Sequence, residues 1–166
     1  GKVVNPETTD HNSILWFRES GADENFAVTA SLSVKLGSDS DPNGGFVISD
    51  GSSTICVSIL NNGYRVYSAN DFDGRYQVRN VSGMANLLTG DVTITLKKQG
   101  ATYYLYADYP DNVTGEAAKL IGSFGGTLTS TNNPAKSFTM PSGDVAVGLS
   151  FRTGATVTYY DMAYSA

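Results

Sequence analysis

One run of oxygen-bearing side chains has the spacing of a calcium-binding loop. Asp39, Asp41 and Asn43 stand at alternate positions, Gly44 follows them, and Asp50 completes the pattern Asp-x-Asp-x-Asn-Gly-x5-Asp. Such loops need oxygen ligands at alternate positions and a Gly at the sharp bend. However, the segment joins two predicted strands rather than two helices, and Asp reaches less far than the usual final Glu. The same residues are typical of a β-turn, so both interpretations stay open.

Aromatic side chains beside polar ones form a second kind of candidate site. A sugar presents apolar C–H faces and a rim of hydroxyls, so its binding sites pair an aromatic ring with Asp, Asn, Gln or Arg. In the predicted strand 102–108, alternation places Tyr104, Tyr106 and Asp108 on the face opposite Leu105. These three residues could bind a ligand, or the Tyr rings could simply pack across neighbouring strands.

A rival group of candidate ligand residues lies between residues 64 and 79. Phe72 stands at the tip of a polar loop, where it could stack on a sugar or cover the core. The remaining members are polar or aromatic, namely Arg65, Tyr67, Asp73, Gln77 and Arg79. Trp16 is the strongest single stacking residue in the chain, but its apolar neighbours Leu15 and Phe17 favour burial in the core.

Residues for nucleophilic or zinc-assisted catalysis are scarce. The chain has one His, His11, and one Cys, Cys56, and it contains no Gly-x-Ser-x-Gly or phosphate-binding motif. A zinc site would need several Cys or His ligands. We therefore predict no catalytic residues and no enzymatic activity.

Period-two alternation of apolar and polar residues predicts the strands that position these candidates. It is clearest over 26–36, where one face is apolar and the other carries Ser, Thr and Lys. Further strands are predicted at 14–18, 45–49, 54–60, 64–69, 76–81, 92–98, 102–108, 119–124, 145–152 and 156–164, separated by turn residues. This spacing predicts one all-β sandwich or barrel domain over 1–166, with its core over about 14–165. Residues 84–88 and 115–119 are weak helix candidates, and 125–143 is predicted to cross the surface as a long loop.

The composition excludes several classes of function. The net charge is −5 and the 11 Lys and Arg are scattered, whereas a nucleic-acid-binding domain would show a basic stripe. The chain has no run of 18 apolar residues, so we predict no membrane insertion. The single Cys56 cannot form an internal disulfide, and it lies in an apolar run typical of a buried strand.

Residues 92–108, 145–164 and 25–32 carry a shared strand and turn pattern, and together they resemble the laminin-G-like branch of the concanavalin A-like lectin and glucanase superfamily. Residues 92–108 resemble the central hairpin of that family, and 145–164 resemble its closing pair of strands. Residues 25–32 resemble its first long strand. The resemblance covers roughly 14–165, with one departure: Asp91-Val92 stands where a Trp often opens the central hairpin.

This resemblance implies a jelly-roll β-sandwich of two antiparallel sheets. It also implies a structural calcium ion near Asp161, with Asn25 or Glu24 as a partner ligand, although Asp161 could equally belong to a hydrogen-bond network at a strand edge. The β-glucan-cutting members use a Glu-x-Asp-x-x-Glu strand motif, which this chain lacks. Other members are carbohydrate-binding modules or adhesion domains, and the fold alone does not choose between these roles.

We expect a non-catalytic carbohydrate-binding module that recognises a neutral glycan through Tyr stacking and polar side chains. We expect it to be part of a larger secreted or cell-surface bacterial protein. The alternatives are a structural or adhesion domain without a sugar ligand and a degenerate glycoside hydrolase domain.

Overall fold

The computed structural model describes residues 3–5, 14–21, 24–82, 90–108, 119–152 and 154–166. Its strands are β1 (Val3–Asn5), β2 (Ile14–Ser20), β3 (Phe26–Leu36), β4 (Gly44–Ser49), β5 (Thr54–Leu60), β6 (Gly63–Ser68), β7 (Asp71–Val78), β8 (Gly90–Gln99), β9 (Thr102–Asp108), β10 (Lys119–Gly125), β11 (Thr127–Thr129), β12 (Ser137–Thr139), β13 (Val145–Phe151) and β14 (Ala155–Ser165). The described residues form no helix, and thus none that could cross a membrane.

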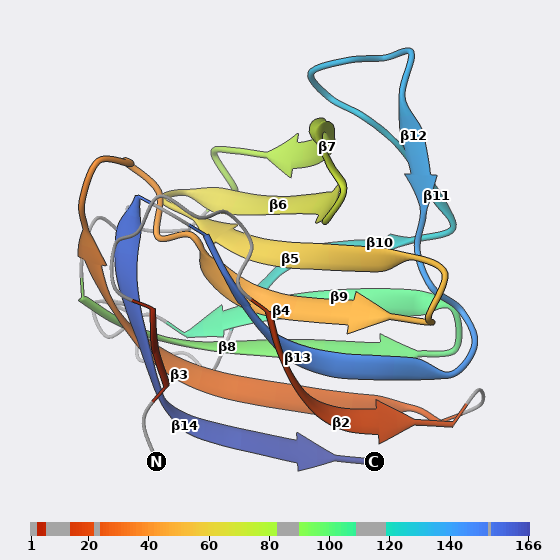
Figure 1. Ribbon diagram of the computed structural model, residues 1–166, viewed down its shortest axis with the longest axis horizontal. Helices are drawn as coiled ribbons and strands as arrows, with labels where there is room; N and C mark the ends of the chain where they lie inside the picture. Colours follow the sequence, from red (N-terminus) through yellow and green to blue (C-terminus); the bar gives the residue numbers. More distant parts are fainter. Residues whose placement is uncertain (1–2, 6–13, 22–23, 83–89, 109–118, 153) are drawn as a thin grey trace.

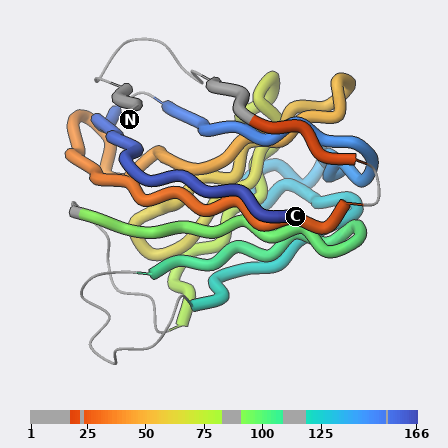
Figure 2. The backbone as a smooth tube through the Cα atoms, turned by 90° about the horizontal axis from the view of Figure 1, so that it is seen from below, coloured from red at the N-terminus to blue at the C-terminus, as the bar shows by residue number. Residues whose placement is uncertain are grey.

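The strands form a sandwich of two six-stranded antiparallel sheets. Sheet A has the order β1-β14-β3-β8-β9-β10, and sheet B has the order β2-β13-β4-β5-β6-β7. Sheet B lies in front of sheet A in Figure 1, and Figure 2 shows most of sheet A side by side in that order. Consecutive strands often lie in different sheets or far apart in one sheet, as in a jelly roll. The predicted fold class, an all-β jelly-roll sandwich, is confirmed.

The core lies between the two sheets and follows the alternation of the sequence. In β3, five side chains from Phe26 to Val34 are buried and the intervening residues are half-buried. The facing side of sheet B supplies Ile48, Val57 and Leu149, which are fully buried in the same cluster. Tyr159 of β14 crosses the core: its hydroxyl donates to the carbonyl oxygen of Gly45 and accepts from the Gly45 N–H at 2.6 Å. This contact ties the two sheets together.

Sheet B differs from sheet A because its outer face is buried as well. All of β4, nearly all of β5 and most of β6 are buried on both faces. The outward side chains Val47, Cys56 and Tyr67 form a second apolar cluster, against which Ala69 and Phe72 pack. This burial is unusual, because one face of an antiparallel sheet commonly meets solvent.

The structure departs from the sequence prediction in three places. The short strand β1, which pairs with β14, was not predicted. The strand predicted at 76–81 begins earlier, at Asp71, so Asp73-Gly74 lies within β7 rather than in a loop. The segment predicted as a long loop, 125–143, contains the hairpin β11–β12, which forms an arm beside β7 (Figure 1). The arm is rich in Thr, Ser and Asn and too short for an apolar alternation to show. The helix candidate 84–88 and most of the candidate 115–119 lie outside the described residues, and Lys119 begins β10.

Candidate functional site

The outer face of sheet B brings polar and aromatic side chains into register across five strands. One row runs from Gly148 through Val47 and Cys56 to Tyr67. The next row runs from Ser150 through Gly45, Ser58 and Arg65 to Gln77. Because directly opposed residues share a face, Arg65, Tyr67 and Gln77, three residues predicted to bind a ligand, do lie together.

Phe72 lies over this face and gathers three arginines around its ring. The ring meets Tyr67 edge-on, with 5.1 Å between centroids. The guanidinium carbons of Arg152, Arg75 and Arg65 lie 4.0, 4.8 and 5.1 Å from the Phe72 centroid. These distances are those of cation–π contacts. Phe72 therefore holds guanidinium groups and is not an open stacking platform for a sugar. We name the set Phe72, Arg65, Arg75 and Arg152 the arginine cluster.

Asp41 forms a buried ion pair with Arg65 of this cluster. Its carboxylate accepts from Arg65 Nη2 at 3.2 Å and from Arg79 Nη2 at 2.8 Å. The side chains of Arg65 and Asp41 are only 6% and 5% exposed. Burial acts to raise the pKa of Asp41, but the hydrogen bonds from Arg79 and the Asn61 N–H, together with the two guanidinium charges, lower it below its usual value. Asp41 is therefore an ionised structural partner of the arginines rather than a proton donor.

Arg65 is held in an unusual environment for a cation. Its Nε donates to Gln77 Oε1 at 3.0 Å, while Nη1 is buried without a hydrogen-bond partner in the described part of the chain. Burial and the nearby charge of Arg152 lower the pKa of Arg65 to about 10, although Asp41 acts in the opposite direction. The guanidinium remains charged at neutral pH, so a positive charge lies under this face of the sheet.

The other titratable groups of the face are poor acids or bases at neutral pH. Burial raises the pKa of the Cys56 thiol and also that of the Tyr67 hydroxyl. A neutral thiol and a neutral phenol are not nucleophiles. Cys56 and Tyr67 are therefore both uncharged at neutral pH.

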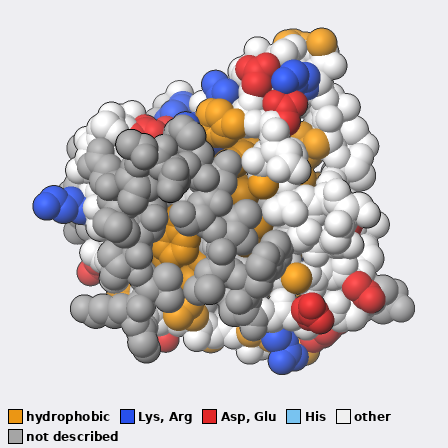
Figure 3. All heavy atoms as spheres, in the orientation of Figure 1, with side chains coloured by type: hydrophobic (Ala, Val, Ile, Leu, Met, Phe, Trp, Pro, Cys, Tyr) orange, Lys and Arg blue, Asp and Glu red, His pale blue; other side chains and the backbone are white. Residues whose placement is uncertain are grey.

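The predicted residue Asp73 lies at the edge of the face rather than in the cluster. Its carboxylate accepts from Asn132 and Asn133, both at 3.1 Å, and lies 3.3 Å from Lys136 Nζ. These partners belong to the turn between β11 and β12, and a group of red and blue side chains marks this edge in Figure 3. Asp73 thus attaches the arm to β7.

The Tyr strip lies on the opposite side of the molecule, on the outer face of sheet A. As predicted from alternation, Tyr103 is fully buried, Tyr104 and Tyr106 are half-buried on the outer face, and Asp108 is exposed. Tyr104 stands opposite Lys97, and Tyr106 stands opposite Thr95. A small pocket of about 200 Å³ adjoins Asp108, lined also by Tyr160 and Thr93. The strip is therefore a separate candidate surface from the arginine cluster.

Trp16 lies in β2, whose backbone pairs with β13 so that Trp16 stands opposite Gly148. His11 lies outside the described residues.

The residues of the predicted calcium loop are largely engaged by protein groups. Asp39 accepts from Asn43 Nδ2 at 2.9 Å and lies 3.8 Å from Arg152 Nη1, and Asp41 binds the arginines described above. Asp50 instead accepts from the N–H groups of Ser52 and Ser53, as in a turn. The described residues contain no group of three acidic, His or Cys side chains placed to hold a metal ion. Calcium at this loop stays a prediction.

The second predicted calcium site is not assembled either. Asp161 stands opposite Ser31 in the middle of β3, whereas Asn25 precedes the first residue of that strand. Asn25 Oδ1 accepts from the Gly100 N–H at 2.8 Å, and Glu24 accepts from the Tyr164 hydroxyl. In this structure, therefore, Asn25 and Glu24 act as turn and edge partners.

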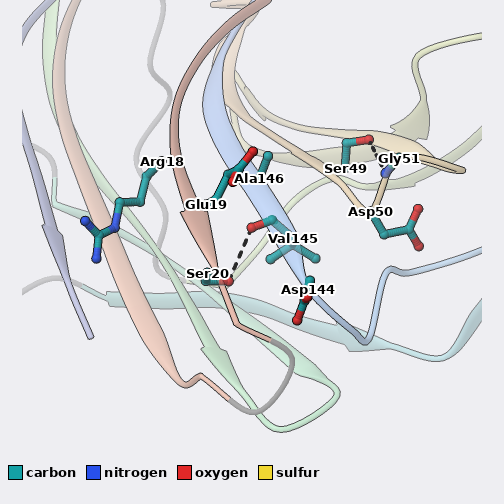
Figure 4. A pocket seen from close by; sticks show the side chains of 9 residues that line it. All are labelled: Arg18, Glu19, Ser20, Ser49, Asp50, Gly51, Asp144, Val145 and Ala146. Carbon is teal, nitrogen blue, oxygen red and sulfur yellow. Dashed lines mark hydrogen bonds between the residues drawn. The ribbon is translucent and has the colours of Figure 1, made fainter.

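A larger pocket of about 940 Å³ lies at the ends of β2, β4 and β13 (Figure 4). Glu19, Asp50 and Asp144 contribute carboxylates, but they point in different directions, and Arg18 points away from them. The close polar contacts drawn there are local: Ser20 donates to the Val145 carbonyl oxygen, and the Gly51 N–H donates to Ser49. This pocket has no converging set of groups that would select a ligand.

Sequence reasoning did not place Arg152 in the site. It follows the end of β13, three strands away from β6 in sheet B, and its long side chain reaches Phe72 across the face. No local pattern shows this contact.

No protein-family model and no curated protein matches this chain. Solved structures do match it. A Saccharomyces cerevisiae protein of unknown function matches with a TM-score of 0.58 at 14% identity, over 99% of this chain and 86% of that one. An alginate lyase of polysaccharide lyase family 7, AlgAT5, matches with a TM-score of 0.51 at 9% identity, over 89% of this chain and 62% of the lyase. The GH43 protein BlXynB of Bacillus licheniformis matches with 0.50 at 13% identity, over 84% of this chain and 27% of that protein. At these identities the matches show the fold alone, a jelly-roll β-sandwich of two antiparallel sheets, which agrees with the fold that the resemblance implies.

Proposed function

We propose that this β-sandwich binds a glycan without catalysis and that the binding surface is the arginine cluster on the outer face of sheet B. The observation that supports this most is the set of guanidinium groups around Phe72, next to Gln77. Arg and Gln side chains are suited to the paired hydroxyls of a sugar, because each offers several hydrogen-bond donors or acceptors in a fixed plane. An alginate lyase of polysaccharide lyase family 7 shares the fold, so the fold is compatible with such a ligand.

The charge state of the face supports binding rather than catalysis. Asp41 is neutralised by Arg65 and Arg79, and the pKa values of Cys56 and Tyr67 lie above their usual range. A glycosidase needs a pair of carboxyl groups, one of which keeps its proton at neutral pH. The described carboxylates of this face are those of Asp39 and Asp41, and Asp41 is held ionised by Arg65 and Arg79. The proposed secreted or cell-surface setting within a larger protein stays a prediction.

The test is retention of the protein on insoluble polysaccharides. The panel includes starch, levan, xylan, β-glucan and insoluble polygalacturonate. Arg152→Ala is expected to abolish retention on the bound polysaccharide. Tyr104→Ala/Tyr106→Ala is expected to retain it, because these rings lie on the other sheet.

Retention lost only in the Tyr variant would move the site to sheet A. Absence of retention on every member of the panel would contradict the proposal and favour the structural or adhesion alternative. Melting curves of both variants show whether each remains folded.

A further inference from the structure

We propose that the arginine cluster recognises an anionic group of the glycan, and that this group is a sugar carboxylate. This inference rests on the proposed function and replaces the expectation of a neutral ligand. In this proposal Arg75 and Arg152 contact the carboxylate, and the more deeply buried Arg65 contributes its charge.

The first argument is the balance of charge at the face. Four guanidinium groups, those of Arg65, Arg75, Arg79 and Arg152, lie on or beside it, whereas the facing carboxylates are Asp39 and Asp41. Asp71 and Asp73 lie nearby on β7, but both bind Lys136 of the arm. The chain as a whole is acidic, with a net charge of −5, so a local excess of cations is not a consequence of composition. Like charges gathered in one place repel one another, so an anion bound beside these arginines would relieve part of that repulsion.

The second argument is the supply of unused donors. Arg75 makes one weak hydrogen bond from Nη1, to the Phe72 carbonyl oxygen at 3.5 Å. Arg152 lies 3.8 Å from Asp39, which is too far for a hydrogen bond. A guanidinium has five N–H donors. Within the part of the chain that the structure describes, most donors of Arg75 and Arg152 therefore make no hydrogen bond to a protein group, and the side chain of Arg152 is 18% exposed.

The third argument is the deeply buried Arg65. Its side chain is 6% exposed, and its Nη1 has no hydrogen-bond partner among the described residues. A buried donor without a partner costs free energy comparable to a lost hydrogen bond. The positive charge of Arg65 lies close to Phe72. This charge would stabilise an anion that Arg75 and Arg152 hold beside the same ring.

The fourth argument is that Phe72 fixes the arginines before any ligand arrives. The ring lies within about 5 Å of all three guanidinium carbons and is itself packed on Tyr67. A side chain that is already ordered loses less conformational entropy on binding. A planar guanidinium group can also donate two parallel hydrogen bonds to the two oxygens of a carboxylate. This geometry favours a carboxylate over a monatomic anion.

The experiment uses two ligands with the same sugar backbone, one with free carboxylates and one with uncharged methyl esters in their place. Calorimetric titration of the whole chain compares a galacturonic acid hexamer with its fully methyl-esterified form. The acid is expected to bind at least about tenfold more tightly than the ester. Affinity for the acid is also expected to fall as the salt concentration rises, because salt screens exposed charges.

Variants then locate the anion. Arg152→Gln and Arg75→Gln are each expected to lower affinity for the acid by about tenfold or more, with little effect on the ester. Arg152→Lys keeps the positive charge but lacks the paired planar donors of a guanidinium group. Its affinity for the acid is expected to lie between that of the natural chain and that of Arg152→Gln. Lys97→Gln, which removes one positive charge from the outer face of sheet A, is the matched control and is expected to leave affinity within about twofold. Melting curves confirm that each variant is folded.

The contrary results separate the two proposals. Equal affinity for acid and ester, lost together in Arg152→Gln, would overturn the carboxylate inference and leave glycan binding in place. Acetate binding as tightly as the hexamer would show a site for small anions and would overturn glycan recognition. Failure of both hexamers to bind, while a neutral polysaccharide is retained, would overturn the carboxylate inference alone.

Discussion

The outer faces of the two sheets are built from similar alternating strands but carry very different side chains. On sheet A, neighbouring hydroxyls pair with each other, Thr29 with Thr95 at 3.0 Å and Ser31 with Thr93 at 2.9 Å, and all four are half-buried. On sheet B, the corresponding face carries Arg65 and Asp41 in almost complete burial. Hydroxyls that keep access to water cost little, whereas buried charges cost several kcal/mol unless they are paired. The comparison shows that the outer face of sheet B, unlike that of sheet A, carries charged side chains that are buried and ion-paired.

The largest difference between the faces is expected from Asp41→Asn. Removing this carboxylate leaves the buried Arg65 uncompensated, so the free energy of unfolding should fall by about 3–5 kcal/mol. Asp161→Asn on the outer face of sheet A should change it by less than about 0.5 kcal/mol. Urea unfolding measures both. Similar values for the two variants would show that the buried ion pair does not distinguish the faces.

A smaller loss of stability is expected from Gly45→Ala, in the second row of the sheet B face. A Cβ at this position would collide with the Val57 carbonyl oxygen, which is backbone and cannot rotate away. Overpacking of this kind costs about 1–3 kcal/mol. Gly143→Ala is the control, because a Cβ there would meet nothing within 4 Å. Thermal unfolding of the pair tests the expectation, and an unchanged melting temperature for Gly45→Ala would contradict it.

Acid should weaken the sheet B face through Asp41. The pKa of this carboxyl is lowered in the folded protein from an unfolded value near 3.8. Its contribution to stability is therefore fully present above that value and is lost as the pH falls through the lower folded pKa. Urea unfolding between pH 7 and pH 2 should show a smaller acid-dependent loss in Asp41→Asn than in the natural chain. Identical pH profiles of the two proteins would show that Asp41 does not contribute to the acid-dependent loss of stability.

The smallest effect is expected on sheet A. Tyr104→Phe and Tyr106→Phe remove hydroxyls from half-buried outer rings, and each should change glycan affinity by less than about twofold, because the proposed site lies on the other sheet. Titration with the galacturonic acid hexamer measures this. A loss comparable to that of Arg152→Gln would reverse the assignment of the two faces.

Most of the fold could be predicted from the sequence, because strand alternation is a local property. The strand at 26–36 was predicted with the bounds that the structure shows, and the inward and outward sides of β9 were predicted correctly. The arm β11–β12 was not predicted, because its three-residue strands carry mostly hydroxyl and amide side chains that are also typical of loops.

The site could be predicted only where its members are close in sequence. Two adjacent strands, β6 and β7, carry Arg65, Tyr67, Phe72 and Gln77. Because these residues are also close in sequence, they could be predicted to lie together. Arg152 joins them through sheet topology, which alternation does not specify. The spacing around Asp41 equally fitted a calcium loop, because a buried ion pair with Arg65 and Arg79 depends on contacts made 24 and 38 residues away.

Chemical-shift mapping of the amide signals during titration with the galacturonic acid hexamer tests the central claim most directly. The account predicts the largest shifts at Arg65, Phe72, Arg75 and Arg152, with none above background at Tyr104 and Tyr106. Shifts centred on Tyr104, Tyr106 and Asp108 would contradict it and place the binding surface on sheet A.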